Sequence, residues 1–203
     1  MRGKDDPAAE VHEFWFADAL DSIEASRARG GVWFGSDASF DDEIRKRFES
    51  LPQQAHAGEL DSWLLEPKNA LSLIIVLDQF PRNLHRGSRR SFEFDRAAYT
   101  AASLVIGRGF DEILDPLEAV FLYLPFEHSE EIRDQQACVE LFRALEDRAP
   151  DAHGAMFENF TAYAERHCEV IQRFGRFPHR NEVLGRESSR EEIDYLASGG
   201  ERF

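Results

Sequence analysis

Two segments of the chain place Arg, His and Asn side chains directly after a Phe-Pro pair. They are Phe80-Pro81-Arg82-Asn83 and Phe177-Pro178-His179-Arg180-Asn181. Arginine offers planar donors that grip carboxylates and phosphates, and histidine exchanges protons near neutral pH. Proline restricts the backbone that carries these side chains. The pattern therefore indicates a site that binds an anion or moves a proton.

A third proline segment, Pro125-Phe126-Glu127-His128 followed by Ser129-Glu130-Glu131, supplies acid instead of base. The first two segments lie in locally basic stretches, although the whole chain has a net charge of -15. Two interpretations stay open if the three proline segments meet. Either Arg82, Arg180 or Arg186 pairs with the glutamates of the third segment and closes the fold, or some arginines stay unpaired toward a cleft.

The histidines of the second and third segments are candidates for acid-base chemistry. His128 and His179 could act as general acid and base with Glu127, because an imidazole titrates near neutrality. His128 and Glu131 also have the spacing of a metal-ligand pair, but a second such pair is missing, so we expect no metal site. His167 falls on an apolar helix stripe, which favours a structural role.

Helix signals dominate the elements that must position these side chains, and strand signals are nearly absent. Caps and apolar spacing predict about eight helices joined by short loops, which implies antiparallel neighbours. The apolar run 70–77 resembles a strand in composition, but without a second strand to pair with it we predict a central helix. The main predicted helices cover residues 7–20, 40–51, 70–77, 96–106, 116–124, 130–145, 151–174 and 190–196.

The number of helices between the prolines predicts where the three segments lie. Two helices separate Pro81 from Pro125, and two more separate Pro125 from Pro178. In a chain that runs up and down, two helices return it to the same end. We therefore predict that the three proline segments end helices at one end of the array and converge there.

Length and composition predict a single domain over residues 1–203. The chain has 203 residues and 42% hydrophobic content, which suffices for one sizeable core. No apolar run reaches the roughly 18 residues that span a bilayer, and the first twenty residues are charged, so we expect a soluble, cytoplasmic protein without a signal peptide. The acidic charge excludes nucleic acid and anionic membranes as expected partners.

Sequence motifs of common enzyme classes are absent. The chain contains no GxSxG, HExxH, GxxxxGK[ST] or strand-linked GxGxxG pattern. Cys138 and Cys168 lack CxxC spacing, so we expect buried free thiols. We expect no cofactor.

Four long motifs stand in order along the chain. They are Trp33-Phe34-Gly35, Leu77-Asp78-Gln79-Phe80-Pro81-Arg82-Asn83, Tyr123-Leu124-Pro125-Phe126-Glu127-His128-Ser129-Glu130 and Phe174-Gly175-Arg176-Phe177-Pro178-His179-Arg180-Asn181. In these motifs and their order the chain resembles the bacterial domain-of-unknown-function family numbered 924. The resemblance spans nearly the whole chain and implies an all-helical fold similar to tetratricopeptide repeats, with no established activity.

Three functional hypotheses follow from these residues. The first is a binding protein for a small carboxylate, a phosphate or an acidic peptide terminus. The second is a hydrolase that uses His128 or His179 with Glu127, and the third is a scaffold that binds a protein partner through an apolar groove. The expected ligand-binding residues are Arg82, Asn83, His128, Arg180, Asn181 and Arg186.

Overall fold

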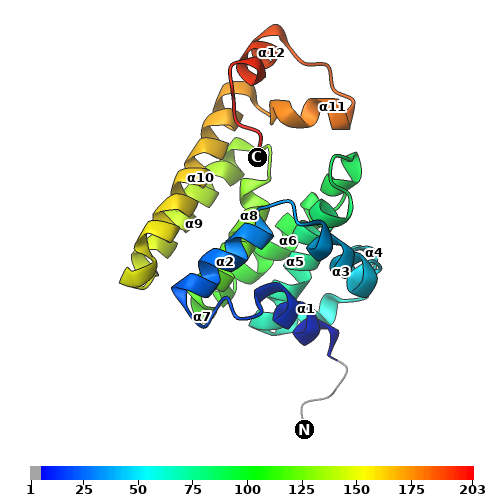
Figure 1. Cartoon of the computed structure of the whole chain (residues 1–203), viewed down its shortest axis with the longest axis vertical. Helices are drawn as coiled ribbons and strands as arrows, with labels where there is room; N and C mark the ends of the chain where they lie inside the picture. Colours follow the sequence, from blue (N-terminus) through cyan, green and yellow to red (C-terminus); the bar gives the residue numbers. More distant parts are fainter. Residues whose placement is uncertain (1–5) are drawn as a thin grey trace.

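The computed structural model describes residues 6–203, and every regular element in that range is helical. The predicted all-α class is confirmed (Figure 1). The α-helices are α1 (Pro7–Phe16), α2 (Ile23–Trp33), α3 (Ala38–Phe48), α4 (Leu51–His56), α5 (Pro67–Leu84), α6 (Asp95–Ile106), α7 (Phe110–Ile113), α8 (Pro116–Glu127), α9 (Ile132–Arg148), α10 (Gly154–Phe174), α11 (Asn181–Leu184) and α12 (Arg190–Ala197). Four 3-10 helices lie between them: η1 (Asp61–Leu65), η2 (Arg89–Phe92), η3 (Asp151–His153) and η4 (Pro178–Arg180).

The described residues form more helices than the sequence predicts, because short helices occupy stretches expected to be loops. The helix α2 lies outside the predicted helices and runs through Gly30 and Gly31, and Ser22 caps its first turn by accepting from the amide of Ala25 at 3.2 Å. The first helix ends at Phe16 instead of Leu20, where Ala17 turns the chain with a φ of 47°. The likeness to tetratricopeptide repeats stays a prediction.

The centre of the fold is α5, which is buried along almost its whole length. It packs against α1, α3, α4, α6 and α8, and the predicted helix over the apolar run is confirmed. The helix α8 is also buried on every side. Figure 1 shows α9 and α10 side by side along one flank, and α11 and α12 together at the end of the molecule away from α1. The long elements therefore hold α5 and α8 in fixed positions.

Two of the three prolines lie inside helices, so the prediction that each one ends a helix is wrong. Pro81 lies within α5 and Pro125 within α8. A proline removes the hydrogen bond to the carbonyl four residues earlier, but the turn that follows it can stay helical. The amide of His85 donates to Pro81 at 3.0 Å, and the amide of His128 donates to Leu124 at 2.9 Å. The polar residues after both prolines are therefore carried by a last helical turn.

Pro178 differs from the other two prolines because it opens a separate short helix. The helix α10 ends at Gly175, whose φ of 68° is left-handed and favours glycine. After two further residues Pro178 begins η4, and α11 follows directly. The Phe177–Asn181 segment is therefore the one proline segment that follows a loop and does not lie in the last turns of a long helix.

An aromatic cluster fastens the first two helices to α8. Phe121 is 1% exposed, and its ring lies 5.5 Å from Trp15, 5.5 Å from Phe16 and 4.8 Å from Trp33 between ring centroids. All three neighbours meet Phe121 edge to face. Such pairs stabilise beyond the area that they bury.

No helix among residues 6–203 is both long enough and apolar enough to cross a membrane.

Replacement of Phe121 tests the contribution of this aromatic cluster. We expect Phe121→Ala to lower the free energy of unfolding by about 3–5 kcal/mol, because it removes a buried ring and leaves a cavity. Urea denaturation followed by circular dichroism measures the change. Ile113→Ala, at a side chain that is 69% exposed, is the control and should change the value by less than about 0.5 kcal/mol. Equal effects of the two substitutions would contradict the assigned role of the cluster.

Candidate functional site

The three proline segments meet, as the helix count predicts. Nδ1 of His128, from the α8 segment, lies 2.8 Å from Oδ1 of Asp78 in α5. Nη1 of Arg180, from the Phe177–Asn181 segment, donates to the carbonyl oxygen of His128 at 2.9 Å. Arg82 lies one turn after Asp78 on α5, with Nη1 at 3.2 Å from the Asp78 carboxylate. The predicted convergence is confirmed. It joins Asp78 to His128, 50 positions apart in the chain, and His128 to Arg180, 52 positions apart.

The arginine of the first segment is paired, but with acids outside the third segment. Arg82 donates two hydrogen bonds to Asp95, at 2.8 and 3.1 Å, besides its ion pair with Asp78. One of the two interpretations paired Arg82, Arg180 or Arg186 with Glu127, Glu130 or Glu131, and the structure places none of these glutamates at Arg82. Asp95 begins α6, so the packing of α6 on α5 brings this acid to Arg82.

The last predicted ligand residues are mostly held within the fold. Arg186 forms a two-pronged pair with Glu130 at 2.6 and 3.0 Å, which matches the interpretation that arginines close the fold. Asn181 donates to Ser188 at 3.1 Å and accepts from Nε of Arg186 at 2.9 Å. These contacts fix the backbone on which Arg180 stands.

Asn83 faces a different element from the other predicted residues. Its Nδ2 donates to Asp41 of α3 at 2.7 Å, and Arg86 grips the same carboxylate at 2.6 and 3.0 Å. The position of Asn83 on the helix explains this, because residues one apart in a helix point in different directions. Asn83 therefore ties α5 to α3 instead of joining Arg180 and His128.

Asp78 and His128 form a buried dyad that orients the imidazole. Asp78 is fully buried and also accepts from Nε2 of Gln79 at 2.6 Å. Burial alone would raise the pKa of Asp78, but the charge of Arg82 and the interactions with His128 outweigh it and hold that pKa below its ordinary value. A charged acceptor at Nδ1 keeps the proton on that nitrogen.

The second nitrogen of His128 is therefore the one that carries a lone pair. Burial, and next the charge of Arg82, lower the pKa of His128 below 6.5, so the ring is neutral at pH 7. Within residues 6–203, Nε2 has no hydrogen-bond partner, and it is not sealed from solvent. A neutral imidazole with a free Nε2 can accept a proton or a hydrogen bond.

Glu127 is a carboxyl that the site keeps protonated. Burial, and next the charge of Asp78, raise its pKa to about 8. Its nearest basic group is Nε2 of His167, at 3.6 Å from Oε1, which is too long for a hydrogen bond. The Nδ1 of His167 donates to the carbonyl of Tyr163 at 2.8 Å. At pH 7 Glu127 is thus a neutral hydrogen-bond donor without a partner among residues 6–203.

Arg180 is the buried cation with the fewest protein partners in this cluster. It is 6% exposed, and its single hydrogen bond is the one from Nη1 to His128. Asp95 lies 3.8 Å away, and Nε is enclosed without a partner among the described residues. Burial, and next the charge of Arg82, lower the pKa of Arg180 to about 10. A guanidinium has five N–H donors, so most of its capacity is unused.

His179 lacks the orienting acid that His128 has. Its Nδ1 is enclosed without a partner in the described part of the chain. Burial, and next the charges of Arg180 and Arg202, lower its pKa to about 4, which keeps the ring neutral. Of the two candidate histidines, His128 is therefore the better placed for acid-base chemistry.

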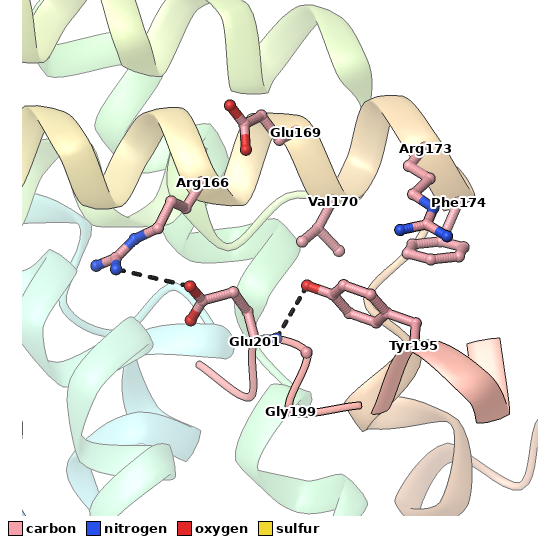
Figure 2. Close-up of a pocket in the computed structure, with 9 residues that line it drawn as sticks. Arg166, Glu169, Val170, Arg173, Phe174, Tyr195, Gly199 and Glu201 are labelled. Carbon is pink, nitrogen blue, oxygen red and sulfur yellow. Dashed lines mark hydrogen bonds and ion pairs between the residues drawn. The ribbon is translucent and has the colours of Figure 1, made fainter. Parts of the chain in front are cut away.

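Two hollows in the surface of the described residues lie outside this cluster. One of about 320 Å³ opens between α10 and the segment after α12, and Figure 2 shows Arg166, Glu169 and Tyr195 around it. The other, of about 230 Å³, is lined by the apolar side chains of Trp33, Phe34, Met156 and Phe160 together with the polar Ser26, Arg27 and Asn159. The second hollow is where the scaffold hypothesis would place a partner, and that hypothesis stays a prediction.

Thiol and metal chemistry have little support from the arrangement of side chains. Cys138 and Cys168 are free thiols, and the prediction that both are buried holds for Cys138, whereas Cys168 is half-buried. Burial raises the pKa of both, which makes them weak nucleophiles. Across residues 6–203, no three His, Cys, Asp or Glu side chains gather in a way that could hold a metal ion.

The raised pKa of Glu127 predicts a pH dependence of stability. The folded state holds the proton that the unfolded state releases above a pKa of 4.5, so stability should fall as the pH rises from 4.5 to 8. Glu127→Gln keeps the neutral form at every pH. We expect its stability relative to the wild type to grow by an amount on the order of 4 kcal/mol over this range.

Denaturant unfolding at a series of pH values measures this difference, and Glu131→Gln, at the exposed neighbouring acid, is the matched control. A constant difference between Glu127→Gln and the wild type from pH 4.5 to 8 would show that Glu127 is charged in the folded state.

Comparison with known proteins agrees with the resemblance seen in the motifs. Residues 11–200 match the family described as bacterial protein of unknown function (DUF924). A solved structure of a protein of unknown function from Agrobacterium tumefaciens is 36% identical, with a TM-score of 0.80, and the alignment covers 95% of this chain and 97% of that chain. No curated protein matches the chain. The chain therefore belongs to the DUF924 family of bacterial proteins.

Proposed function

We propose that this protein binds a small anion, a carboxylate or a phosphate, at Arg180. The observation that carries the proposal is the guanidinium of Arg180, which is buried yet donates one hydrogen bond to the protein within residues 6–203. A buried charge without a full set of partners is costly. An anion at Arg180 would supply the missing acceptor.

Neighbouring groups add to the attraction for an anion. Arg82 contributes positive charge near Arg180, and this charge lowers the pKa of Arg180. A bound anion would raise that pKa again. The neutral carboxyl of Glu127 can donate a hydrogen bond to an anionic oxygen, whereas an ionised one would repel it. Arg180 also lies over the ring of Phe177, with 4.3 Å between Cζ and the centroid, which holds the guanidinium plane in place.

The proposal narrows the predicted ligand-binding set. Arg180 is the residue proposed to contact the anion, and His128 and Arg82 lie beside Arg180. Asn181 and Arg186 position the backbone, and Asn83 belongs to a separate contact with α3. A cytoplasmic location is part of the same proposal, since two free thiols suit a reducing compartment.

Anion binding predicts a ligand-dependent rise in stability that depends on Arg180. At a free concentration of acetate or phosphate of 100 times Kd, we expect the wild type to gain about 2.7 kcal/mol. Arg180→Gln should lose this gain, because it removes the charge and the planar donors. Thermal unfolding of each protein, compared with its own ligand-free midpoint, measures the effect.

The matched control is Arg190→Gln, because the Arg190 side chain is 86% exposed and lies outside the site. It should respond to anions as the wild type does. Isothermal titration of the folded Arg180→Lys variant separates the loss of planar donors from any loss of structure. A wild type that shows no binding of acetate or phosphate would refute the proposal.

A hydrolase is the second candidate, and the Asp78–His128 dyad is the observation that favours it. His128 Nε2 would take a proton from water as that water attacks a carbonyl carbon, and neutral Glu127 would give its proton to the leaving oxygen. Asp78 would hold the ring in the required tautomer, as the acid of a catalytic triad does.

This candidate predicts ester hydrolysis that rises with pH through a pKa below 6.5, the ordinary value for histidine. The rate of release of 4-nitrophenol from 4-nitrophenyl acetate at several pH values measures it. His128→Gln should lower the rate of hydrolysis at least about 100-fold. His56→Gln, at an exposed histidine, should leave the rate unchanged. Equal rates for the two variants would rule out His128 as the base.

A further inference from the structure

The segment that follows α12 folds back over the site. Figure 1 shows the end of the described chain running from α12 into the space between α10 and α11. The ring of Phe203 stacks on the imidazole of His167, with 3.4 Å between centroids and 22° between planes. Phe177 and His179 meet the same ring edge on, at 5.8 and 6.1 Å. The three neighbours of Phe203 form an aromatic slot, which we define as His167, Phe177 and His179.

The aromatic slot shares its walls with the anion site. Phe177 has the ring of Phe203 on one side and the guanidinium of Arg180 at 4.3 Å. His167 stacks on Phe203 and also approaches Glu127, at 3.6 Å from Nε2 to Oε1. A ring in the slot would therefore lie against the two side chains that contact Arg180 and approach Glu127.

The segment that carries Phe203 is held by few polar contacts. The amide of Glu201 donates to the hydroxyl of Tyr195 at 2.9 Å, and the Glu201 carboxylate lies 3.6 Å from Arg166, as Figure 2 shows. Both partners of the ion pair are about 40% exposed, and exposed pairs contribute little. The hollow of about 320 Å³ lies between this segment and α10, so the segment is loosely packed there. Phe203 can therefore leave the slot without disrupting a buried polar network.

We infer that the aromatic slot, filled here by Phe203, receives the ring of an aromatic carboxylate whose carboxylate group binds Arg180. The inference rests on the proposed function and names its ligand class. A carboxylate suits the site better than a phosphate, because Arg82 and Arg180 already face Asp78 and Asp95, and a single added negative charge disturbs this balance least. Phe203 competes with the ligand for the slot.

Competition by Phe203 gives the inference a direct test. A ligand that binds only molecules whose slot is empty has an apparent affinity equal to its intrinsic affinity multiplied by the fraction of such molecules. Phe203→Ala should therefore bind 3-phenylpropionate at least about tenfold more tightly than the wild type, while acetate affinity stays unchanged. Isothermal titration with 3-phenylpropionate, phenylacetate, benzoate and acetate measures both effects, and Ile193→Ala on α12 is the matched control.

A second readout covers the case in which Phe203→Ala alters the fold. The ring protons of His167 lie against Phe203, so its removal should shift their nuclear magnetic resonance signals, and 3-phenylpropionate should shift them back. If acetate binds through Arg180 but aromatic carboxylates bind Phe203→Ala no better than acetate, the inference is overturned and the proposed function stands. If no anion binds to either protein, both are overturned.

Discussion

The buried carboxylate of Asp78 is the constraint on which the rest of the site depends. It lies on the central helix α5, receives Nδ1 of His128 from α8 at 2.8 Å, and holds Arg82 of its own helix at 3.2 Å. A buried charge needs such partners, since each one alone would be costly. The same carboxylate repels a second negative charge nearby, which contributes to the raised pKa of Glu127. One acid thus orients the imidazole, anchors an arginine and keeps a neighbouring carboxyl neutral.

Arg180 completes the arrangement, and the acids near it are bonded to other arginines. Asp95 accepts two hydrogen bonds from Arg82, and Glu130 accepts hydrogen bonds from Arg186. Arg180 is left with a backbone carbonyl and two aromatic rings, those of Phe92 and Phe177, as its close neighbours. Its position is well defined, yet most of its N–H donors have no partner among residues 6–203. This distinguishes Arg180 from the arginines that only close the fold.

The helical class, the meeting of the proline segments and the pairing of Arg186 with Glu130 could be predicted from the sequence, and the partners of Arg82 and Arg180 could not. Helix periodicity reports which face is buried, and counting helices between Pro81, Pro125 and Pro178 was enough to predict their convergence. Asp95 was missed because a partner in another helix leaves no local spacing signal. The one available signal was Asp78 itself, an acid one helical turn before Arg82 inside an apolar run. The path of α6 and the return of Phe203 depend on packing between distant elements.

In the proposed function, Arg180 binds a carboxylate beside the aromatic slot that Phe203 fills. A crystal structure of the protein soaked with 3-(4-bromophenyl)propionate tests it most directly, because anomalous scattering from bromine locates the ring. We predict the bromine among His167, Phe177 and His179, the carboxylate within hydrogen-bond distance of Arg180, and Phe203 displaced. A structure in which Phe203 stays in place and Arg180 contacts protein atoms alone would contradict the claim.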